Sequence, residues 1–266
     1  MHTSLRTLTC ALAVASAVAA APAAANPGLQ RVHGGPGASA SLRGGVLTMR
    51  WTGGSSRVRV PAGYALPAVT TRGALGGLSY SGQTAVLAGR YAGGRSHFLI
   101  AEFGTLTPLA LAGRVTFDAI SPDGSSVYVT RRASTTDPTR YTVLSYSRSE
   151  HALTAVTTKV VFSAEGNERP DGWQMQGVAL ARSTAAAGDW VYTLYRSREY
   201  PFIHALPVGL GAWAVCIELP ESWRARVGTL RLRAGAGRTV SVLSATGAVL
   251  ATANVTTGTL ALTART

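Results

Sequence analysis

Hydrophobic and polar positions alternate in short runs along most of the chain, and turns centred on glycine separate these runs. The clearest copy is an apolar run at residues 117–120, a Ser-Pro-Asp-Gly turn at 121–124 and an alternating run at 126–130. Pro122 presets its own φ, and Gly124 can adopt the positive φ that a tight reversal between antiparallel strands demands. The pattern therefore predicts two antiparallel strands joined by this turn.

The same pattern occurs four times, with its turn glycines at Gly82, Gly124, Gly188 and Gly237. The glycines are 42, 64 and 49 residues apart, which fits a four-stranded propeller blade of about 40 to 50 residues with one long insertion. Helical periodicity is absent outside the first 25 residues. We therefore expect an all-β chain, a β-propeller of about five four-stranded blades. A β-sandwich is the alternative fold, and six blades are the alternative count if residues 26–68 and 163–176 each supply strands.

The pattern also divides the chain into regions. Residues 1–25 are expected to form a helical signal peptide, residues 26–44 a flexible lead-in with one strand at 29–33, and residues 45–266 the propeller domain. A hairpin over residues 46–60 would make a partial or fifth blade that closes the ring against the last one. The other blades are expected at residues 70–112, 114–162, 177–220 and 227–264.

The leader combines a charged start at Arg6, an apolar stretch at 8–20 and small residues before Asn26. We expect cleavage after Ala25, with Ala21 as the neighbouring alternative and an uncleaved anchor as the remaining one. No later apolar run approaches the roughly 20 residues of a membrane span, so we expect a secreted protein with no transmembrane span after cleavage. Cys216 is then the remaining cysteine, and it reads as a buried side chain on a strand.

The chain has 25 Lys and Arg against 12 Asp and Glu, a formal net charge of +13. An excess of arginine favours an anionic partner, since guanidinium groups bind phosphates and carboxylates. A compositional bias toward arginine without any partner is the alternative, because the arginines do not form one run in the sequence. Nucleic acid is not an expected partner of an exported protein.

One region resembles a known group of proteins. Residues 120–130 with 137–141 resemble the YVTN-type secreted β-propellers, and residues 189–195, 201–206 and 214–220 are similar to blades of uncharacterised exported actinobacterial propeller proteins. The resemblance covers about residues 75 to 262 and implies a propeller fold, but no biochemical role. Thr184–Gly188 departs from the Ser-Pro-Asp-Gly turn expected there.

Residue patterns that carry catalysis are missing from the sequence. Gly77–Gly82 lacks the spacing of a nucleophile elbow, and the histidines stand alone, without the spacing of metal ligands. His204 is better explained as a structural histidine than as a catalytic base. We therefore expect no catalytic residues, no metal and no cofactor. The alternative is a secreted hydrolase or lactonase-like enzyme with its site in the channel of the propeller.

Long loops at 89–96, 131–140, 163–176 and 197–201 would emerge on one face of such a ring. They combine arginines that could capture an anion with flat aromatic rings that could stack on a sugar. The ligand-binding residues predicted there are Arg132, Arg140, Arg169, Trp173 and Tyr200. We expect a monomeric binding or scaffold module at the cell envelope, whose partner is an unidentified envelope polymer or protein, with an anionic or carbohydrate polymer as the candidate. A hydrated loop face without a ligand is the alternative.

Overall fold

The computed structural model describes residues 28–132, 139–156, 158–162, 168–169, 175–209 and 213–263. These residues form 22 strands and two short 3-10 turns, with no α-helix among them. No helix in this part of the chain is long and apolar enough to cross a membrane. The predicted signal peptide, residues 1–25, lies outside the described residues.

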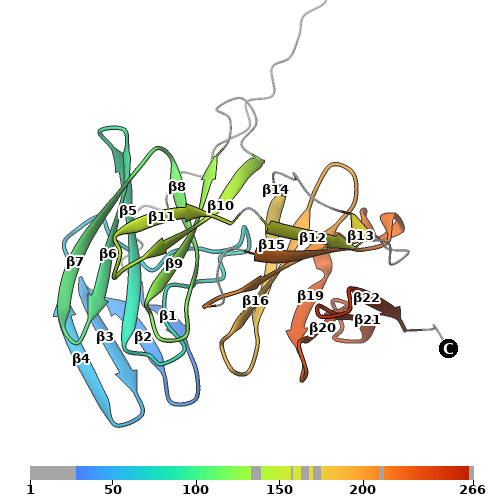
Figure 1. The fold of residues 1–266 in the computed structure, drawn as a ribbon. Coiled ribbons are helices and arrows are strands. Elements are labelled where there is room, and N and C mark those ends of the chain that lie inside the picture. The colour runs from blue at the N-terminus through green and yellow to red at the C-terminus, as the bar shows by residue number, and fades with distance from the viewer. Residues whose placement is uncertain are drawn as a thin grey trace, which may run out of the picture.

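Five sheets follow one another along the chain, and each contains a blade in which successive strands pair antiparallel with their neighbours (Figure 1). The first blade contains β1 (Gln30–His33), β2 (Ser39–Arg43), β3 (Val46–Trp51) and β4 (Gly54–Arg59). The second contains β5 (Thr84–Ala92), β6 (Arg95–Glu102) and β7 (Thr105–Ala112). Its fourth position is taken by a short extended segment, in which Leu78 forms an isolated bridge with Ala85.

The third blade contains β8 (Val115–Ile120), β9 (Ser126–Arg132), β10 (Arg140–Ser147) and β11 (Ala152–Ala155). The fourth contains β15 (Val178–Thr184), β16 (Trp190–Arg196), β17 (Phe202–Pro207) and β18 (Trp213–Glu218). The fifth contains β19 (Arg231–Ala234), β20 (Thr239–Leu243), β21 (Val249–Asn254) and β22 (Thr259–Leu262), and follows the turns η1 (Glu221–Trp223) and η2 (Val227–Thr229). The chain is thus a five-bladed β-propeller, as the sequence pattern predicts, and not a two-sheet sandwich.

The structure confirms the predicted glycine turn, which connects the first two extended segments of each blade. Gly82, Gly124, Gly188 and Gly237 all have positive φ, from 60° to 81°. In three of these turns the glycine N–H donates to the carbonyl three residues earlier, at 2.8 to 3.0 Å. Gly37, with φ of 75°, occupies the corresponding turn of the first blade, which is a fifth copy that the sequence analysis did not identify.

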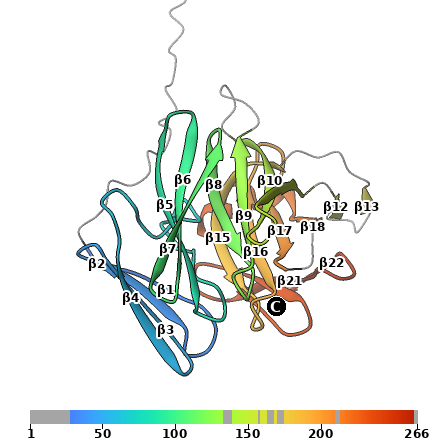
Figure 2. The same cartoon turned by 60° about the vertical axis from the view of Figure 1, so that its left-hand side comes forward.

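Apolar side chains of each blade pack against the blades next to it in the chain. Four clusters of buried residues result, one between each pair of consecutive blades. In order along the chain, their members include Leu47 and Leu87, Val86 and Val127, Val143 and Cys216, and Tyr192 and Val240. None of the four contains residues of both the first and the fifth blade, and these two blades lie on opposite sides of the molecule in Figures 1 and 2.

The expected closure of the ring by the amino-terminal hairpin is therefore wrong for the described residues. Its physical reason lies in the outer faces of the end blades, which carry exposed arginines such as Arg57 and Arg233 instead of apolar residues. Side-chain hydrogen bonds nevertheless connect the linker after the first blade with the segment before the fifth blade. Arg72, in the linker between the first two blades, donates to the carbonyls of Leu230 (2.8 Å) and Gly228, next to the fifth blade.

Four further expectations can be compared with the structure, and three of them need correction. The lead-in at 26–44 is not flexible throughout, because β1 and β2 lie in it and Ala40 and Leu42 enter the core. The strand β12 (Thr158–Phe162) does not belong to the third blade, since it pairs in parallel with β18 of the fourth. The short strands β13 (Glu168–Arg169) and β14 (Met175–Gln176) join existing sheets, so they add no sixth blade. Cys216 is buried, with 1% of its surface exposed.

Candidate functional site

Two of the five predicted loop-face residues, Arg132 and Arg140, lie at the ends of strands. Arg132 ends β9 opposite Tyr141, and Arg140 begins β10 opposite Gln176, so the two arginines flank one strand connection. Tyr200 is half-buried, and its backbone N–H and carbonyl both bind the Ser197 hydroxyl.

The remaining two predicted residues are less well defined. The backbone of Arg169 pairs with Val161 in β13 and β12. Trp173 lies outside the described residues.

A hollow of about 290 Å³ lies beside these positions. Three arginines border it, together with Thr139 and Gln176. Arg196 ends β16, Arg198 lies in the loop after it, and Arg224 directly follows η1. No acidic side chain is among its described lining residues. Sequence reasoning placed Arg198 on this face, but it missed Arg224, which is distant in the chain.

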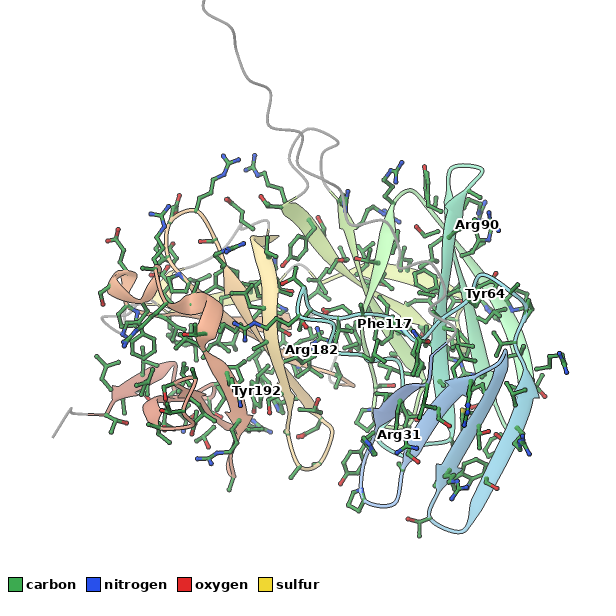
Figure 3. The ribbon with its side chains drawn as sticks, turned by 180° about the vertical axis from the view of Figure 1, so that it is seen from behind. Arg31, Tyr64, Arg90, Phe117, Arg182 and Tyr192 are labelled. Atoms are coloured by element: carbon green, nitrogen blue, oxygen red, sulfur yellow. The ribbon has the colours of Figure 1, made fainter. Side chains whose placement is uncertain are left out.

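A second cationic surface lies on the outer face of the first blade. The register of β1–β4 forms three rows across the sheet, His33-Ser39-Arg50-Ser55, Arg31-Ser41-Thr48-Arg57 and Arg43-Val46-Arg59. We call this surface the arginine face. All five arginines are exposed, and Figure 3 labels Arg31 on the innermost strand. The opposite side of the same strands supplies Leu47 and Met49, both fully buried, to the core.

No acidic residue neutralises the arginine face from within its own part of the chain. The first Asp or Glu in the sequence is Glu102. Its carboxylate is bound by Arg148 at 2.8 Å, and this hydrogen bond lowers the pKa of Glu102. The face therefore presents positive charge to solvent, interspersed with Ser and Thr hydroxyls that can donate hydrogen bonds.

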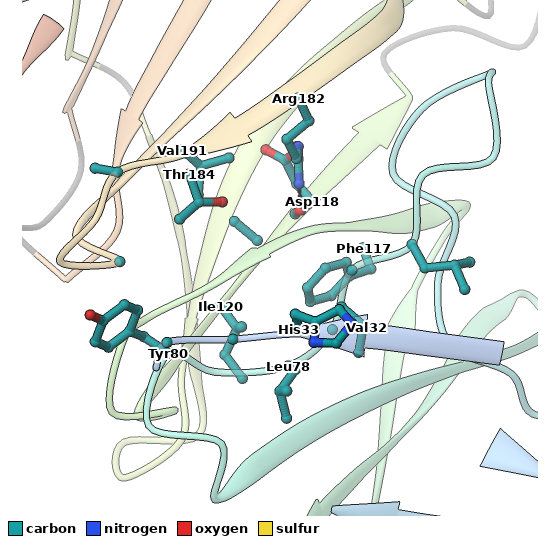
Figure 4. A pocket seen from close by; sticks show the side chains of 18 of the residues that line it. Val32, His33, Leu78, Tyr80, Phe117, Asp118, Ile120, Arg182, Thr184 and Val191 are labelled. Atoms are coloured by element: carbon teal, nitrogen blue, oxygen red, sulfur yellow. Dashed lines mark hydrogen bonds and ion pairs between the residues drawn. The ribbon is translucent and has the colours of Figure 1, made fainter. Parts of the chain in front are cut away.

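A cavity of about 530 Å³ lies at the centre of the propeller (Figure 4). Elements of the first four blades line it, and its walls are mostly apolar. The apolar lining includes Val32, Leu75, Leu78, Phe117, Ile120 and Val191. Its polar side chains are His33, Tyr80, Asp118, Arg182 and Thr184.

Tyr80 forms part of this wall, between turns of two other blades. A Cβ on Gly35 would come within 2.7 Å of the Tyr80 ring, and a Cβ on Gly188 within 2.5 Å of Tyr80 Cβ. Both positions therefore require glycine for close approach, and Gly188 requires it also for its φ of 74°. The Gly35 N–H donates to the Tyr80 carbonyl at 2.8 Å, which holds the backbone at Tyr80 against the first blade.

Arg182 and Asp118 form an ion pair in the cavity wall. Arg182 lies on β15 and Asp118 on β8, so the pair joins the fourth and third blades, and the two side chains point toward one another in Figure 4. The Arg182 guanidinium donates to the Asp118 carboxylate, to the Asp118 carbonyl and, through Nε, to Thr193 Oγ1 at 3.1 Å. Only 12% and 6% of the two side chains is exposed. The pair is thus almost buried and carries no net charge.

Behind this wall His204 lies beside Cys216, with Nδ1 and Sγ 3.5 Å apart. Both residues are 1% exposed. Burial lowers the pKa of His204 to about 4, and Asp118 offsets part of that effect. A neutral histidine enclosed in the core agrees with the structural role expected from the sequence, because no substrate can reach it.

These surfaces are suited to binding. In the described part of the chain, no group of three or more His, Cys, Asp or Glu residues could hold a metal ion. The described lining of the central cavity includes neither Ser nor Cys, and its single carboxylate is engaged by Arg182. What the geometry offers is an open cationic sheet, a small arginine-lined hollow and a neutral, mainly apolar cavity.

Comparison with known proteins gives resemblances of fold without a family. No family model matches the sequence, and no curated protein matches it. Among solved structures, oligopeptidase B from Trypanosoma brucei is similar over 89% of this chain and 34% of its own, at 11% identity and a TM-score of 0.45. TolB from Acinetobacter baumannii is similar over 83% and 53%, at 11% identity and a TM-score of 0.42. The Dos1 propeller is similar over 86% and 56%, at 11% identity and a TM-score of 0.36. This chain thus spans from about a third to just over half of the length of these three proteins. With TM-scores below 0.5, the fold assignment rests on the five sheets themselves.

Proposed function

We propose that this chain is a secreted, non-enzymatic propeller module that binds an anionic polymer of the cell envelope through the arginine face. The observation that carries the proposal is five exposed arginines on one face of one sheet, in a chain without an acidic residue before Glu102. Unneutralised charges of one sign raise the local concentration of oppositely charged ligands and accelerate their binding.

The arrangement of these arginines favours a polymer over a small anion. Arg43 and Arg59 are two strands apart, about 10 Å, and Arg57 and Arg59 are two residues apart, about 7 Å. A small anion needs donors that converge on one point, whereas these donors are spread across four strands. A polymer with a charge on each repeat unit can contact several of them at once, and multiple weak contacts add up to useful affinity.

The envelope location and the exported state are further parts of the proposal. They are motivated by the leader-like sequence before Asn26 and by the resemblance of residues 120–130 to YVTN-type secreted propellers. Amino-terminal sequencing of the exported protein tests the leader. We expect it to begin at Asn26, and a protein that retains Met1 would contradict export by cleavage.

The loop face is proposed as a second contact region for the same ligand. The hollow bordered by Arg196, Arg198 and Arg224 favours it, because it adds three cationic side chains near the predicted Arg132 and Arg140. The rival function, a hydrolase or lactonase-like enzyme in the channel, has no comparable support, since the described cavity lining contains no nucleophile paired with a base.

The experiment measures binding of the mature protein to poly(glycerol phosphate), with uncharged dextran as the neutral polymer. We expect binding to the phosphate polymer alone. Its affinity should fall by about 100-fold between 50 and 200 mM salt, because several phosphate contacts release counterions. Equal binding to dextran would contradict the anionic ligand, and tighter binding to poly(dT) at equal phosphate concentration would contradict the envelope assignment.

Charge-reversal variants test whether the arginine face is the surface that binds the polymer. The double variant Arg57→Glu/Arg59→Glu should bind at least about 10-fold more weakly and lower the salt dependence by about two charges. The matched control is Arg231→Glu/Arg233→Glu, which reverses two exposed arginines at the same spacing on β19 of the fifth blade. An equal loss of affinity in both variants would mean that net charge, not the arginine face, determines binding.

A further inference from the structure

The central cavity contains a polar pair that its apolar walls do not require. Packed apolar residues of similar volume would hold the third and fourth blades together at least as well as a buried ion pair, which has to be desolvated. Arg182 and Asp118 nevertheless border a hollow of about 530 Å³, which is within the range of roughly 300 to 1,000 Å³ for small-molecule sites.

The pair has hydrogen-bonding capacity left for a ligand. The described residues supply acceptors for three of the five guanidinium N–H groups of Arg182. The Asp118 carboxylate can accept more bonds than the one from Arg182, since its two oxygens offer about four lone-pair positions. The wall therefore presents a donor and an acceptor side by side.

The charge of a ligand in this cavity is restricted. Arg182 and Asp118 neutralise one another, so an additional carboxylate or ammonium group on the pair would lie among mainly apolar side chains without a counter-charge. Taking a charged group out of water without such a partner is costly. An uncharged group that both accepts and donates suits the pair, and a secondary or primary amide presents its C=O and N–H in this way.

The side chains that line the cavity favour an amide with an apolar substituent over a sugar. A sugar brings many hydroxyl groups, each of which needs a partner when it is buried. The cavity instead offers mostly apolar side chains, with Phe117 and Tyr80 as flat rings for an apolar substituent.

We propose that the central cavity binds a small uncharged amide with an apolar substituent, its amide group on Arg182 and Asp118 and its apolar part against Phe117, Ile120 and Val191. This site is independent of the arginine face and of the anionic polymer proposed above.

The test uses N-acetyl-phenylalaninamide as the probe, with ligand-observed NMR and calorimetry on the mature protein. A dissociation constant of the order of 1 mM is expected for a ligand of this size. N-acetyl-phenylalanine, which carries a carboxylate, and phenylalaninamide, which carries an ammonium group, should each bind at least about 10-fold more weakly. Methyl glucoside should not bind.

Two variants on one turn locate the binding. Ala186 is exposed and borders the cavity, whereas its neighbour Ala187 is exposed and does not border it. Ala186→Trp should block the cavity and abolish binding of the probe, and Ala187→Trp should leave binding unchanged. Because both changes lie in an exposed turn, each variant should fold, which a thermal melt would verify.

Asp118→Asn gives a third readout. It keeps the size of the side chain and leaves the Arg182 charge without its partner, so the preference should move from the amide probe toward N-acetyl-phenylalanine. No saturable binding of the amide probe to the folded parent up to about 20 mM would overturn the proposal. Equal binding to parent and Ala186→Trp would also overturn it, as would binding of methyl glucoside in place of the amide.

Discussion

Arginine side chains occupy two contrasting environments in this molecule. On the arginine face, five of them are exposed, and the neighbouring sequence contains no acidic residue. In the central cavity, Arg182 is nearly buried, and Asp118 and Thr193 accept its hydrogen bonds. The first arrangement makes an electrostatic field that acts at a distance, whereas the second makes a fixed, neutral polar group that acts only on contact.

This difference explains why the five blades do not join into a closed ring. A blade can pack only through a face that is apolar, and the first blade has one such face, which supplies Leu47 and Met49. Its other face carries the arginines. The third and fourth blades tolerate Arg182 between them because Asp118 neutralises it there. Charge without a partner thus ends the series of blades, while paired charge can be accommodated between two of them.

The largest effect is expected from breaking the ion pair between Arg182 and Asp118. Asp118→Ala leaves Arg182 buried without a counter-charge, and we expect it to lower the free energy of unfolding by about 3 to 5 kcal/mol. Arg57→Ala on the arginine face should change it by no more than about 0.5 kcal/mol. Urea unfolding at neutral pH measures both values. A cost below about 1 kcal/mol for Asp118→Ala would show that water or other groups replace the carboxylate.

The second prediction concerns the histidine behind the cavity wall. The folded-state pKa of His204, about 4, lies below the value of about 6.5 for an unfolded chain. The unfolded state therefore binds the proton first as the pH falls. Stability from this group is fully present above pH 6.5 and is lost toward pH 4, by about 3 kcal/mol.

Replacing the histidine tests this assignment. His204→Phe cannot take up a proton and should lose less stability than the parent between pH 7 and pH 4, as measured by urea unfolding at several pH values. Parallel losses in parent and variant would place the acid sensitivity in other groups. Arginines of the first blade cannot contribute to it, because they stay protonated throughout this range.

The third prediction compares two turn glycines. Gly53, between β3 and β4, has φ of 86° with nothing near its missing Cβ, while Gly188 combines φ of 74° with the contact to Tyr80. Gly53→Ala should therefore cost about 1 kcal/mol through backbone strain alone. Gly188→Ala should cost about 1 to 2 kcal/mol more, because the methyl group also displaces Tyr80. Equal costs, measured by chemical unfolding, would mean that Tyr80 moves freely.

Local features of the fold could be predicted from the sequence, and long-range ones could not. The turns at Gly82, Gly124 and Gly188 depend on a few adjacent residues, so their pattern is visible in the chain. The pairing of β12 with β18 of the next blade depends on contacts distant in sequence, and no local pattern specifies it.

The same distinction applies to the sites. Arg43 and Arg59 share one row only because Val46 lies between them in the sheet register, and Arg182 meets Asp118 across 64 positions of sequence. One signal for the arginine face was present in the sequence, the absence of any acidic residue before Glu102. It becomes meaningful only when combined with the alternation of residues 46–59, which places Arg50, Arg57 and Arg59 on one side.

The smallest effect is expected from substitutions on the loop face, and its size relative to that of the arginine-face variant shows which face contributes more to polymer binding. The triple variant Arg132→Ala/Arg140→Ala/Trp173→Ala should weaken binding of poly(glycerol phosphate) by a few-fold, less than Arg57→Glu/Arg59→Glu, because it removes charge at the edge of the contact. Its melting temperature should stay close to that of the parent, since substitutions away from the buried core usually change stability little. Binding and melting measured on the same samples keep the two effects apart. If the triple variant loses as much affinity as the charge-reversed first blade, the loop face is the principal site; if it binds as the parent does, the ligand contacts the arginine face alone.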